Sequence, residues 1–208
     1  MSTLSRPLIL GSTSRYRHEL LSRLQLPFEV VSPHVDETPL PHEAPQALAC
    51  RLALAKAQAV AALHPEAVVI GSDQVAELHG EPLGKPMSHA VAVQQLQRMS
   101  GQEVTFHTAV CVRCENSGFE DVQVAPVHVR FRTLSDTAIE AYLLKDQPYD
   151  CAGASKSESL GVALLERLDS DDPTALIGLP LIRTLQMLRA AGLDVLTMTP
   201  YPSVASNV

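Results

Sequence analysis

The sequence predicts a mixed α/β protein whose sheet is shared by two lobes around a central substrate cleft. Three patterns favour this fold class. Apolar strands alternate with helices in the first half of the chain, two long strands separated by a turn follow, and the chain closes with helices. Such alternation places helices on the faces of a sheet. The length of 208 residues is expected to form a single domain over residues 1–208.

The first segments predict strands on either side of a helix. Residues 8–10 form a short apolar strand, and the turn at residues 11–14 offers N-caps for a helix that carries Leu20 and Leu21. Residues 28–31 predict a second strand. The prolines of residues 33–45 exclude regular structure, and this loop is long enough to be functional.

The next segments repeat the alternation. Apolar residues at helical spacing predict a helix over residues 46–63, and residues 68–70 predict a buried strand that ends in the turn Gly71-Ser72-Asp73-Gln74. Residues 80–86 form a loop or hairpin turn. Ser88 is the predicted cap of a helix that Gly101 closes.

A change of period marks the second half. Residues 104–112 and 122–131 alternate as two antiparallel strands around a turn at residues 116–118, with Pro126 marking a bulge or an edge. The remaining segments are a helix after Ser135, a returning strand at residues 162–168, a helix from Pro180 to Gly192 and a frayed tail at residues 197–208.

Composition narrows the function classes. The chain has 16 Lys and Arg against 23 Asp and Glu, a net charge of -7, which argues against a broad nucleic-acid surface. No apolar stretch approaches a membrane span, and residues 1–10 lack the hydrophobic core of a secretory signal. We therefore expect a cytoplasmic protein that binds neither a nucleic-acid polymer nor a membrane.

The four cysteines are expected to be reduced thiols. Cys111 and Cys114 have CxxC spacing, but no second ligand pair follows at a zinc-like interval. In a strand, residues three apart face opposite sides, so the two sulfurs should diverge. The structural interpretation is therefore favoured over a metal site.

Acidic residues provide candidate chemistry at two loops. Asp73 follows an apolar strand, where a carboxylate suits a metal ligand or a general base, although Gly-Ser-Asp is also common turn material. Asp36 and Glu37 form a second carboxylate pair, which by itself is more often a solvated loop.

Basic candidates lie beside loops and strand ends. Arg15, Arg17, Lys85 and Lys156 could each reach an anion. Lys56 borders an apolar helical stripe, so its ammonium could reach a cleft or snorkel toward solvent, and snorkelling is the favoured expectation. The amides of residues 11–14 could also hold a phosphate at a helix N-terminus. Separated cations and carboxylates together suit an enzyme that holds a polyphosphate with Mg²⁺.

Read in order, these motifs resemble the Maf family of nucleoside triphosphate pyrophosphatases, over about residues 7–192. Several motifs in the family's order are much more specific than one. The segments that resemble it are LGSTSRYRHELL at residues 10–21, VDET at 35–38, IGSDQV at 70–75, GKP at 84–86, YDCAGASKSE at 149–158 and GLPL at 178–181.

The resemblance implies a Maf/ITPase-like fold and hydrolysis between the α and β phosphates of a nucleotide with Mg²⁺ or Mn²⁺. By position, Asp73 matches the catalytic proton acceptor, which could also share the metal, and Glu37 matches a metal ligand. The implied substrate-site positions are Ser12, Tyr16, Arg17, Lys56, Gln74, Lys85 and Glu158. A homodimer is also implied.

Tyr16, Gln74 and Glu158 match the positions that distinguish the subgroups, and their pattern resembles the subgroup that acts on 7-methyl-GTP. An aromatic face and a carboxylate suit a cationic, guanine-like base. Two alternatives stay open: a dTTP/UTP or broad-specificity pyrophosphatase, and a non-catalytic nucleotide-binding regulator of cell division.

Three residues depart from the family pattern. Arg15 replaces a proline and His18 replaces a basic residue, changes that could alter loop rigidity and phosphate affinity. Ser159 replaces a glycine, which could shift Glu158 if that position needs a positive φ.

Overall fold

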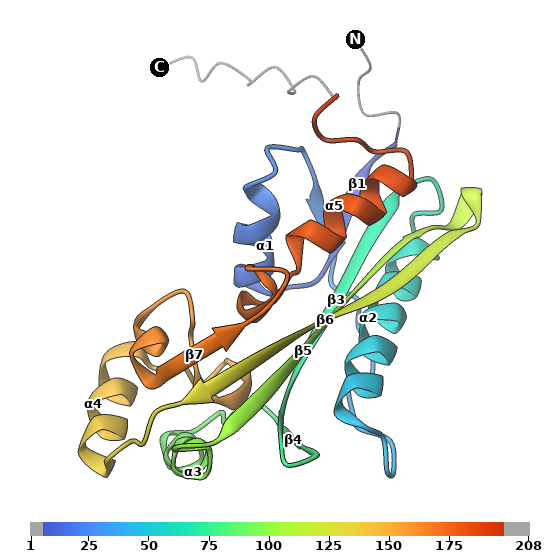
Figure 1. Cartoon of the computed structure of the whole chain (residues 1–208). Helices are drawn as coiled ribbons and strands as arrows, with labels where there is room; N and C mark the ends of the chain where they lie inside the picture. Colours follow the sequence, from blue (N-terminus) through green and yellow to red (C-terminus); the bar gives the residue numbers. More distant parts are fainter. Residues whose placement is uncertain (1–5, 198–208) are drawn as a thin grey trace, which may run out of the picture.

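A seven-stranded mixed sheet is the framework of the computed structural model, which describes residues 6–197 (Figure 1). Its strand order is β2-β1-β3-β5-β6-β7, with β4 paired to β3. The strands are β1 (Leu8–Gly11), β2 (Glu29–Val30), β3 (Val68–Leu78), β4 (Glu81–Leu83), β5 (Glu103–Cys114), β6 (Phe119–Phe131) and β7 (Leu165–Asp169).

Five α-helices and four short 3₁₀ helices complete the described chain. The α-helices are α1 (Arg15–Ser22), α2 (Pro45–Ala61), α3 (His89–Met99), α4 (Asp136–Asp146) and α5 (Leu181–Ala190). The 3₁₀ helices are η1 (Glu115–Ser117), η2 (Ala152–Ala154), η3 (Leu160–Leu164) and η4 (Ala175–Ile177). Ser14, Ser88 and Ser135 cap α1, α3 and α4 by accepting hydrogen bonds from backbone N–H groups, which confirms the predicted starts of the last two helices.

The core confirms two lobes on one sheet. At one end, α2 packs on one face of β3 and β5, and α1 and α5 pack on the other face (Figure 1). At the other end, α3, α4 and the extensions of β3, β5 and β6 enclose a third apolar cluster. The long strands β3, β5 and β6 run through both ends and join the lobes (Figure 1).

The prediction that the third strand ends at residue 70 is wrong. β3 continues to Leu78, because β5 pairs with it from Val69 to Glu77 without interruption. This long antiparallel ladder outweighs the turn preference of Gly-Ser-Asp. Asp73 and Gln74 therefore lie within a strand.

One edge of β3 nevertheless has a gap. β1 pairs with β3 as far as Gly71, and β4 pairs with it from Ala76. Within the described chain, residues 72–75 have no strand beside them on that edge. The gap places Asp73 and Gln74 at an open position between the lobes.

Two further boundary predictions need correction. The returning strand starts at Leu165 rather than residue 162, because residues 160–164 form η3. Pro126 causes no bulge, since it pairs in register with His107; the irregularity of β6 lies at Arg130/Phe131. The prediction that Pro126 marks an edge fits the structure. β7 pairs with β6 only from His128 onward, so no strand pairs with Pro126 on that side of β6 within the described chain.

The two cysteines of the CxxC segment behave as predicted. Cys111 packs in the cluster beneath α2, and Cys114 packs in the cluster beneath α5 on the opposite face. Both are buried free thiols. The predicted tail, apart from Thr197, lies outside the described residues.

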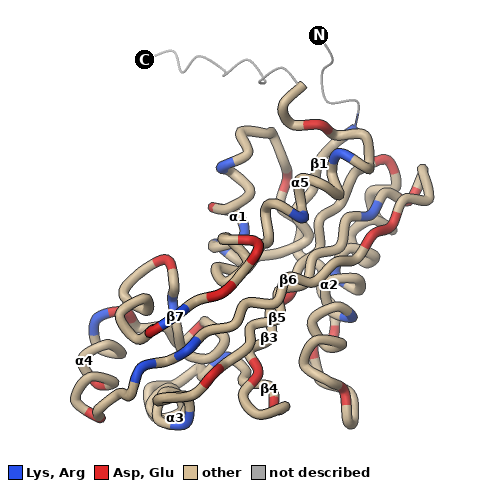
Figure 2. Tube along the Cα trace, viewed as in Figure 1, with Lys and Arg blue, Asp and Glu red and all other residues tan. Residues whose placement is uncertain are grey.

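The described residues show the mixed charge and the lack of long apolar segments that the composition predicts. Lys and Arg are interleaved with Asp and Glu along the chain (Figure 2). Among residues 6–197, no helix has both the length and the apolar character that a membrane crossing needs.

Gly71 allows α2 to approach the sheet closely. A Cβ atom at this position would lie 2.3 Å from the Ala53 carbonyl oxygen and 2.6 Å from the Ala57 nitrogen. Both are backbone atoms, so the contact cannot be relieved by a rotamer change.

We expect Gly71→Ala to lower the free energy of unfolding by about 2 kcal/mol or more, because overpacking costs roughly 1–3 kcal/mol even where side chains can shift. Urea denaturation measures this change. Gly84→Ala is the matched control: a Cβ there meets nothing within 4 Å, so a change below about 0.5 kcal/mol is expected. Equal stability of the two variants would contradict the close packing of α2.

Candidate active site

A cleft of about 980 Å³ opens at the gap in the edge of β3 and is lined by both lobes. All nine site residues predicted from the sequence border it: Ser12, Tyr16, Arg17, Glu37, Lys56, Asp73, Gln74, Lys85 and Glu158. They come from the start of α1, the Pro-rich loop, α2, β3, the loop after β4 and the segment before β7. The structure thus brings the predicted residues together, while their roles stay predictions.

A buried ammonium lies at the centre of the charged side of the cleft. Lys56 Nζ is 2.7 Å from Asp73 Oδ1 and 2.6 Å from Glu37 Oε1. The Lys56 side chain is only 6% exposed, so the expectation that it snorkels to solvent is wrong. A buried charge needs partners, and two carboxylates provide them here.

Glu37 responds electrostatically to this arrangement. Burial alone would raise the pKa of Glu37, but the hydrogen bond from Lys56 and the charges of Lys56, Lys85 and Arg17 lower the pKa below its ordinary value. Glu37 is therefore ionised at neutral pH. Asp36, the other member of the predicted carboxylate pair, does not line the cleft. Its Oδ1 instead accepts a hydrogen bond from the Thr38 N–H at 2.9 Å within the loop.

Arg17 is anchored between two loops that border the cleft. Its Nε donates to the Gly178 carbonyl at 2.8 Å, and its Nη1 donates to Ser12 Oγ at 3.3 Å. Burial lowers the pKa of Arg17, and the carboxylates of Asp73 and Glu37 oppose that effect. Guanidinium groups stay protonated in proteins, so this position supplies a permanent cation.

The other basic candidates are in different environments. Lys85 is exposed on the loop after β4, where it borders the cleft and lowers the pKa of Glu37. Lys156 does not line the cleft. Its Nζ donates to the Asp146 carbonyl at 2.6 Å and so holds the end of α4.

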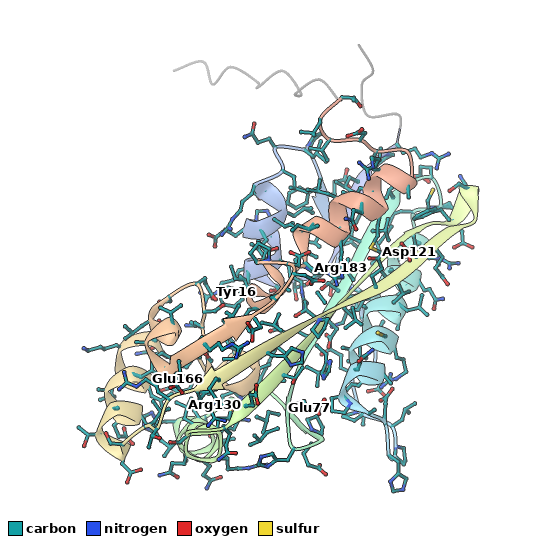
Figure 3. All side chains as sticks on the ribbon, in the orientation of Figure 1. Tyr16, Glu77, Asp121, Arg130, Glu166 and Arg183 are labelled. Carbon is teal, nitrogen blue, oxygen red and sulfur yellow. The ribbon has the colours of Figure 1, made fainter. Side chains whose placement is uncertain are left out.

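Tyr16, on α1 (Figure 3), contacts residues of the segment after α4 that also line the cleft. Its hydroxyl lies 3.3 Å from both carboxylate oxygens of Asp150 and within 3.5 Å of Cys151 Sγ. The Arg15 guanidinium lies over the Tyr16 ring, 4.7 Å from the centroid. Burial raises the pKa of the Tyr16 hydroxyl, so Tyr16 is neutral at physiological pH.

Ser159, the departure that follows Glu158, has a φ of -133°. The positive φ that would favour glycine at this position is therefore absent. Ser159 Oγ also donates to Asp146 Oδ1 at 2.6 Å. Burial of the carboxyl group raises the pKa of Glu158.

Sequence reasoning missed Thr108, which touches Gln74. Thr108 is fully buried on β5, and its Oγ1 lies 2.9 Å from Gln74 Nε2. The available signal was a hydroxyl between Phe106 and Val110 on an otherwise apolar face of a strand. The contact of Asp150 with Tyr16 was also missed, because it joins residues 134 positions apart.

Comparison with known proteins agrees with this arrangement. A family model described as "Maf-like protein" matches residues 7–191. The chain belongs to the Maf family.

The curated relatives named "7-methyl-GTP pyrophosphatase" include proteins from three organisms that align over most of this chain. The protein of Polaromonas sp. is 66% identical and aligns over 90% of this chain and 86% of its own; the protein of Albidiferax ferrireducens is 62% identical over 93% and 97%. That of Thiobacillus denitrificans is 55% identical over 95% and 98%. Among solved structures, the Ham1 protein of Staphylococcus aureus aligns over 61% of this Maf-family chain and 72% of its own at 17% identity, with a TM-score of 0.44, too low to carry an argument.

We expect Lys56→Met to raise the pKa of Glu37, because the substitution removes a hydrogen bond and a charge that oppose the effect of burial. Carbon-13 NMR titration of the Glu37 carboxyl measures the shift. Arg51→Met is the control: Arg51 pairs with Glu43 at 2.6 Å and should leave the Glu37 titration unchanged. If the two variants titrated alike, the Lys56–Glu37 pair would not exist in solution.

Proposed function

We propose that this Maf-family protein hydrolyses the bond between the α and β phosphates of 7-methyl-GTP, releasing 7-methyl-GMP and pyrophosphate. The observation that carries the proposal is the cluster of Lys56, Asp73 and Glu37 in a cleft that is also lined by Arg17 and Lys85. The substrate follows from the name shared by relatives of 55–66% identity. Such an enzyme removes modified nucleotides from the cellular pool.

The cations bind and orient the triphosphate. Arg17 is fixed by Gly178 and Ser12, so it offers its remaining N–H groups without further loss of side-chain freedom. Lys85 lies on the exposed side of the cleft and draws the polyanion in. Together these charges neutralise the negative charge that builds up on the leaving pyrophosphate.

In the reaction, a water oxygen forms a bond to the α phosphorus while the bond from that phosphorus to the α–β bridging oxygen breaks. The bridging oxygen leaves with pyrophosphate, and Asp73 accepts the proton of the attacking water. Lys56 donates to Asp73 Oδ1 at 2.7 Å and so holds the carboxylate in one orientation. Asp73 could also share the metal.

The carboxylates fit a divalent cation that is held jointly with the substrate. Asp73 and Glu37 share one cationic partner, Lys56 Nζ, so both could offer oxygen ligands to a nearby ion. No group of three or more metal-ligating side chains is present in residues 6–197. Mg²⁺ suits such a site, because it is usually bound by one or two carboxylates plus phosphates and water, and Mn²⁺ has similar preferences. The ion would add charge neutralisation on the phosphates.

Tyr16 and Glu158 are the proposed selectors of the base. N7 methylation gives guanine a delocalised positive charge, which favours an aromatic face and a nearby carboxylate. Tyr16 already accommodates the Arg15 guanidinium on its ring, so it tolerates a planar cation. A pyrophosphate-release screen with 7-methyl-GTP, GTP, UTP, dTTP and CTP tests the substrate directly.

The same screen separates the alternatives. A dTTP/UTP or broad-specificity enzyme would turn over those nucleotides as well as 7-methyl-GTP. A non-catalytic regulator of cell division would release no pyrophosphate from any of them with Mg²⁺ or Mn²⁺. The intact cluster of Asp73, Glu37 and Lys56 favours an enzyme.

A homodimer, a single domain over residues 1–208 and a cytoplasmic location are further proposals. The homodimer rests on the resemblance to the family, and the location rests on composition. Sedimentation equilibrium tests the homodimer, limited proteolysis tests the single domain, and fractionation tests the location.

We expect Asp73→Asn to lower kcat for 7-methyl-GTP by at least ~10², because the amide keeps the size of the side chain but cannot accept the proton. Steady-state pyrophosphate release measures the loss, and circular dichroism checks the fold. Asp121→Asn is the matched control. Asp121 lies on β6 near the turn of the β5–β6 hairpin (Figure 3) and does not line the cleft, so this variant should keep wild-type turnover. Near wild-type turnover in Asp73→Asn would remove Asp73 from the mechanism.

For Glu158→Gln, we expect the ratio of kcat/KM for 7-methyl-GTP over GTP to fall about tenfold, or ~1.4 kcal/mol of differential transition-state binding. The charge is lost with little change in size, and the phosphate side is untouched. Glu166→Gln on β7 is the control, since Glu166 does not line the cleft (Figure 3). A constant ratio with both activities reduced would mean that Glu158 does not read the base.

A further inference from the structure

The amide of Gln74 is held by three hydrogen-bond acceptors. Its Nε2 lies 2.9 Å from Thr108 Oγ1 and 3.0 Å from the carbonyl oxygens of both Ala175 and Leu176. These groups come from β5 and η4, so two separate elements converge on one side-chain nitrogen.

The chemistry of these partners allows only one orientation of the amide. The Thr108 hydroxyl donates its single hydrogen to the Ala175 carbonyl at 2.8 Å, so it can only accept from Gln74. Backbone carbonyls also only accept. The amide nitrogen must therefore face all three partners, and the Gln74 oxygen is left to the cleft that the residue borders.

Strand alternation separates this amide from the charged cluster. Asp73 points to the face of β3 covered by α2, where it binds Lys56. Gln74 points to the opposite face, toward Thr108 and η4. η2, in the segment before β7, lies on that second face: a Cβ added at Gly153 of η2 would be 3.5 Å from the Cβ of Ala76 on β3. The two consecutive residues thus face different groups: Asp73 faces Lys56 on α2, and Gln74 faces η4 on the opposite side of the sheet.

We propose that Thr108 is a positioning residue that fixes the polarity of Gln74, so that the cleft presents an acceptor and the base must offer an N–H donor. Guanine has adjacent donors at N1 and N2, whereas adenine has an acceptor at N1 and its amino donor at C6, the position of the guanine O6 acceptor. In a desolvated site, a base that places an acceptor against the Gln74 oxygen leaves both acceptors without a donor, which strongly disfavours its binding. N7 methylation withdraws electrons from the ring and makes the N–H groups better donors. The assignment of a nucleotide rests on the proposed function.

The test measures binding without turnover. Titration calorimetry with Mg²⁺ gives the Kd values of the α,β-methylene analogues of GTP and ATP, whose α–β linkage cannot be hydrolysed. We expect the wild type to prefer the GTP analogue, and Gln74→Met to lower that preference about tenfold. Thr108→Val keeps the shape but removes the hydroxyl, and should lower the preference about threefold or more. Thr108→Ser retains the hydroxyl, so its preference for the GTP analogue should stay within about twofold of the wild-type value.

A double variant shows whether Thr108 acts through Gln74. In the Gln74→Met background, Thr108→Val should change the preference by less than about twofold, because the amide that it positions is gone. An equal loss in both backgrounds would overturn the proposal, as would a wild type that binds the ATP analogue equally well. If Thr108→Val does not fold, as judged by thermal unfolding, Thr108→Ala makes the same deletion with a smaller side chain.

Pyrophosphate release distinguishes this inference from the proposed function. If the wild type selects the GTP analogue, Thr108→Val lowers that preference and no pyrophosphate is released from 7-methyl-GTP, the proposed function is contradicted and the role of Thr108 is supported. A wild type that hydrolyses 7-methyl-GTP but binds both analogues equally supports the function and overturns the inference. In an active enzyme, Thr108→Val should raise KM for 7-methyl-GTP with little change in kcat; a fall in kcat at unchanged KM would overturn the positioning role.

Discussion

The pairing of one buried ammonium with two carboxylates is the constraint on which the site depends. Lys56 reaches Asp73 and Glu37 only because α2 lies close against β1 and β3, and two glycines make that approach possible. A Cβ at Gly11 would lie 3.3 Å from the Lys56 carbonyl oxygen, and one at Gly71 would overlap the backbone of α2. An unpaired buried charge is strongly destabilising, so Lys56 needs its buried partner Asp73, and the half-exposed Glu37 adds a contact from the Pro-rich loop. The positions of the charged side chains in the site therefore depend on how closely α2 packs against the sheet.

The gap in the edge of β3 explains why a strand interior can serve as a site. Residues within a sheet normally have strands on both sides, but residues 72–75 lie between the end of β1 and the start of β4. The ladder with β5 keeps this segment straight, and the missing neighbour leaves space for a ligand. Consecutive residues then face opposite sides, so a single strand can supply both a carboxylate toward α2 and an amide toward η4.

Local patterns were sufficient to predict most elements but not the environment of the key residues. Ser88 and Ser135 mark helix starts because capping is a local interaction, and the apolar periodicity of β5 and β6 gives a hairpin. The extension of β3 past Ser72 and the burial of Lys56 depend on partners distant in sequence, which periodicity cannot encode. The order of short motifs was enough to predict which nine residues would meet. The family pattern did not include Thr108, whose hydrogen bond to η4 joins residues 67 positions apart.

The segment from η4 to Gly178 links the two halves of the cleft. Its carbonyl at Gly178 accepts from Arg17 and from Ser72, while the carbonyls at Ala175 and Leu176 accept from Gln74. Gly178 has φ 128°, a conformation that L side chains rarely adopt, so glycine is needed to turn that carbonyl toward Arg17. The segment is itself fixed to α5, because the buried Asp172 accepts the backbone N–H of Arg183 at 3.1 Å. One short stretch of backbone thus connects α5 to both Arg17 and Gln74, the two cleft residues that its carbonyls hold.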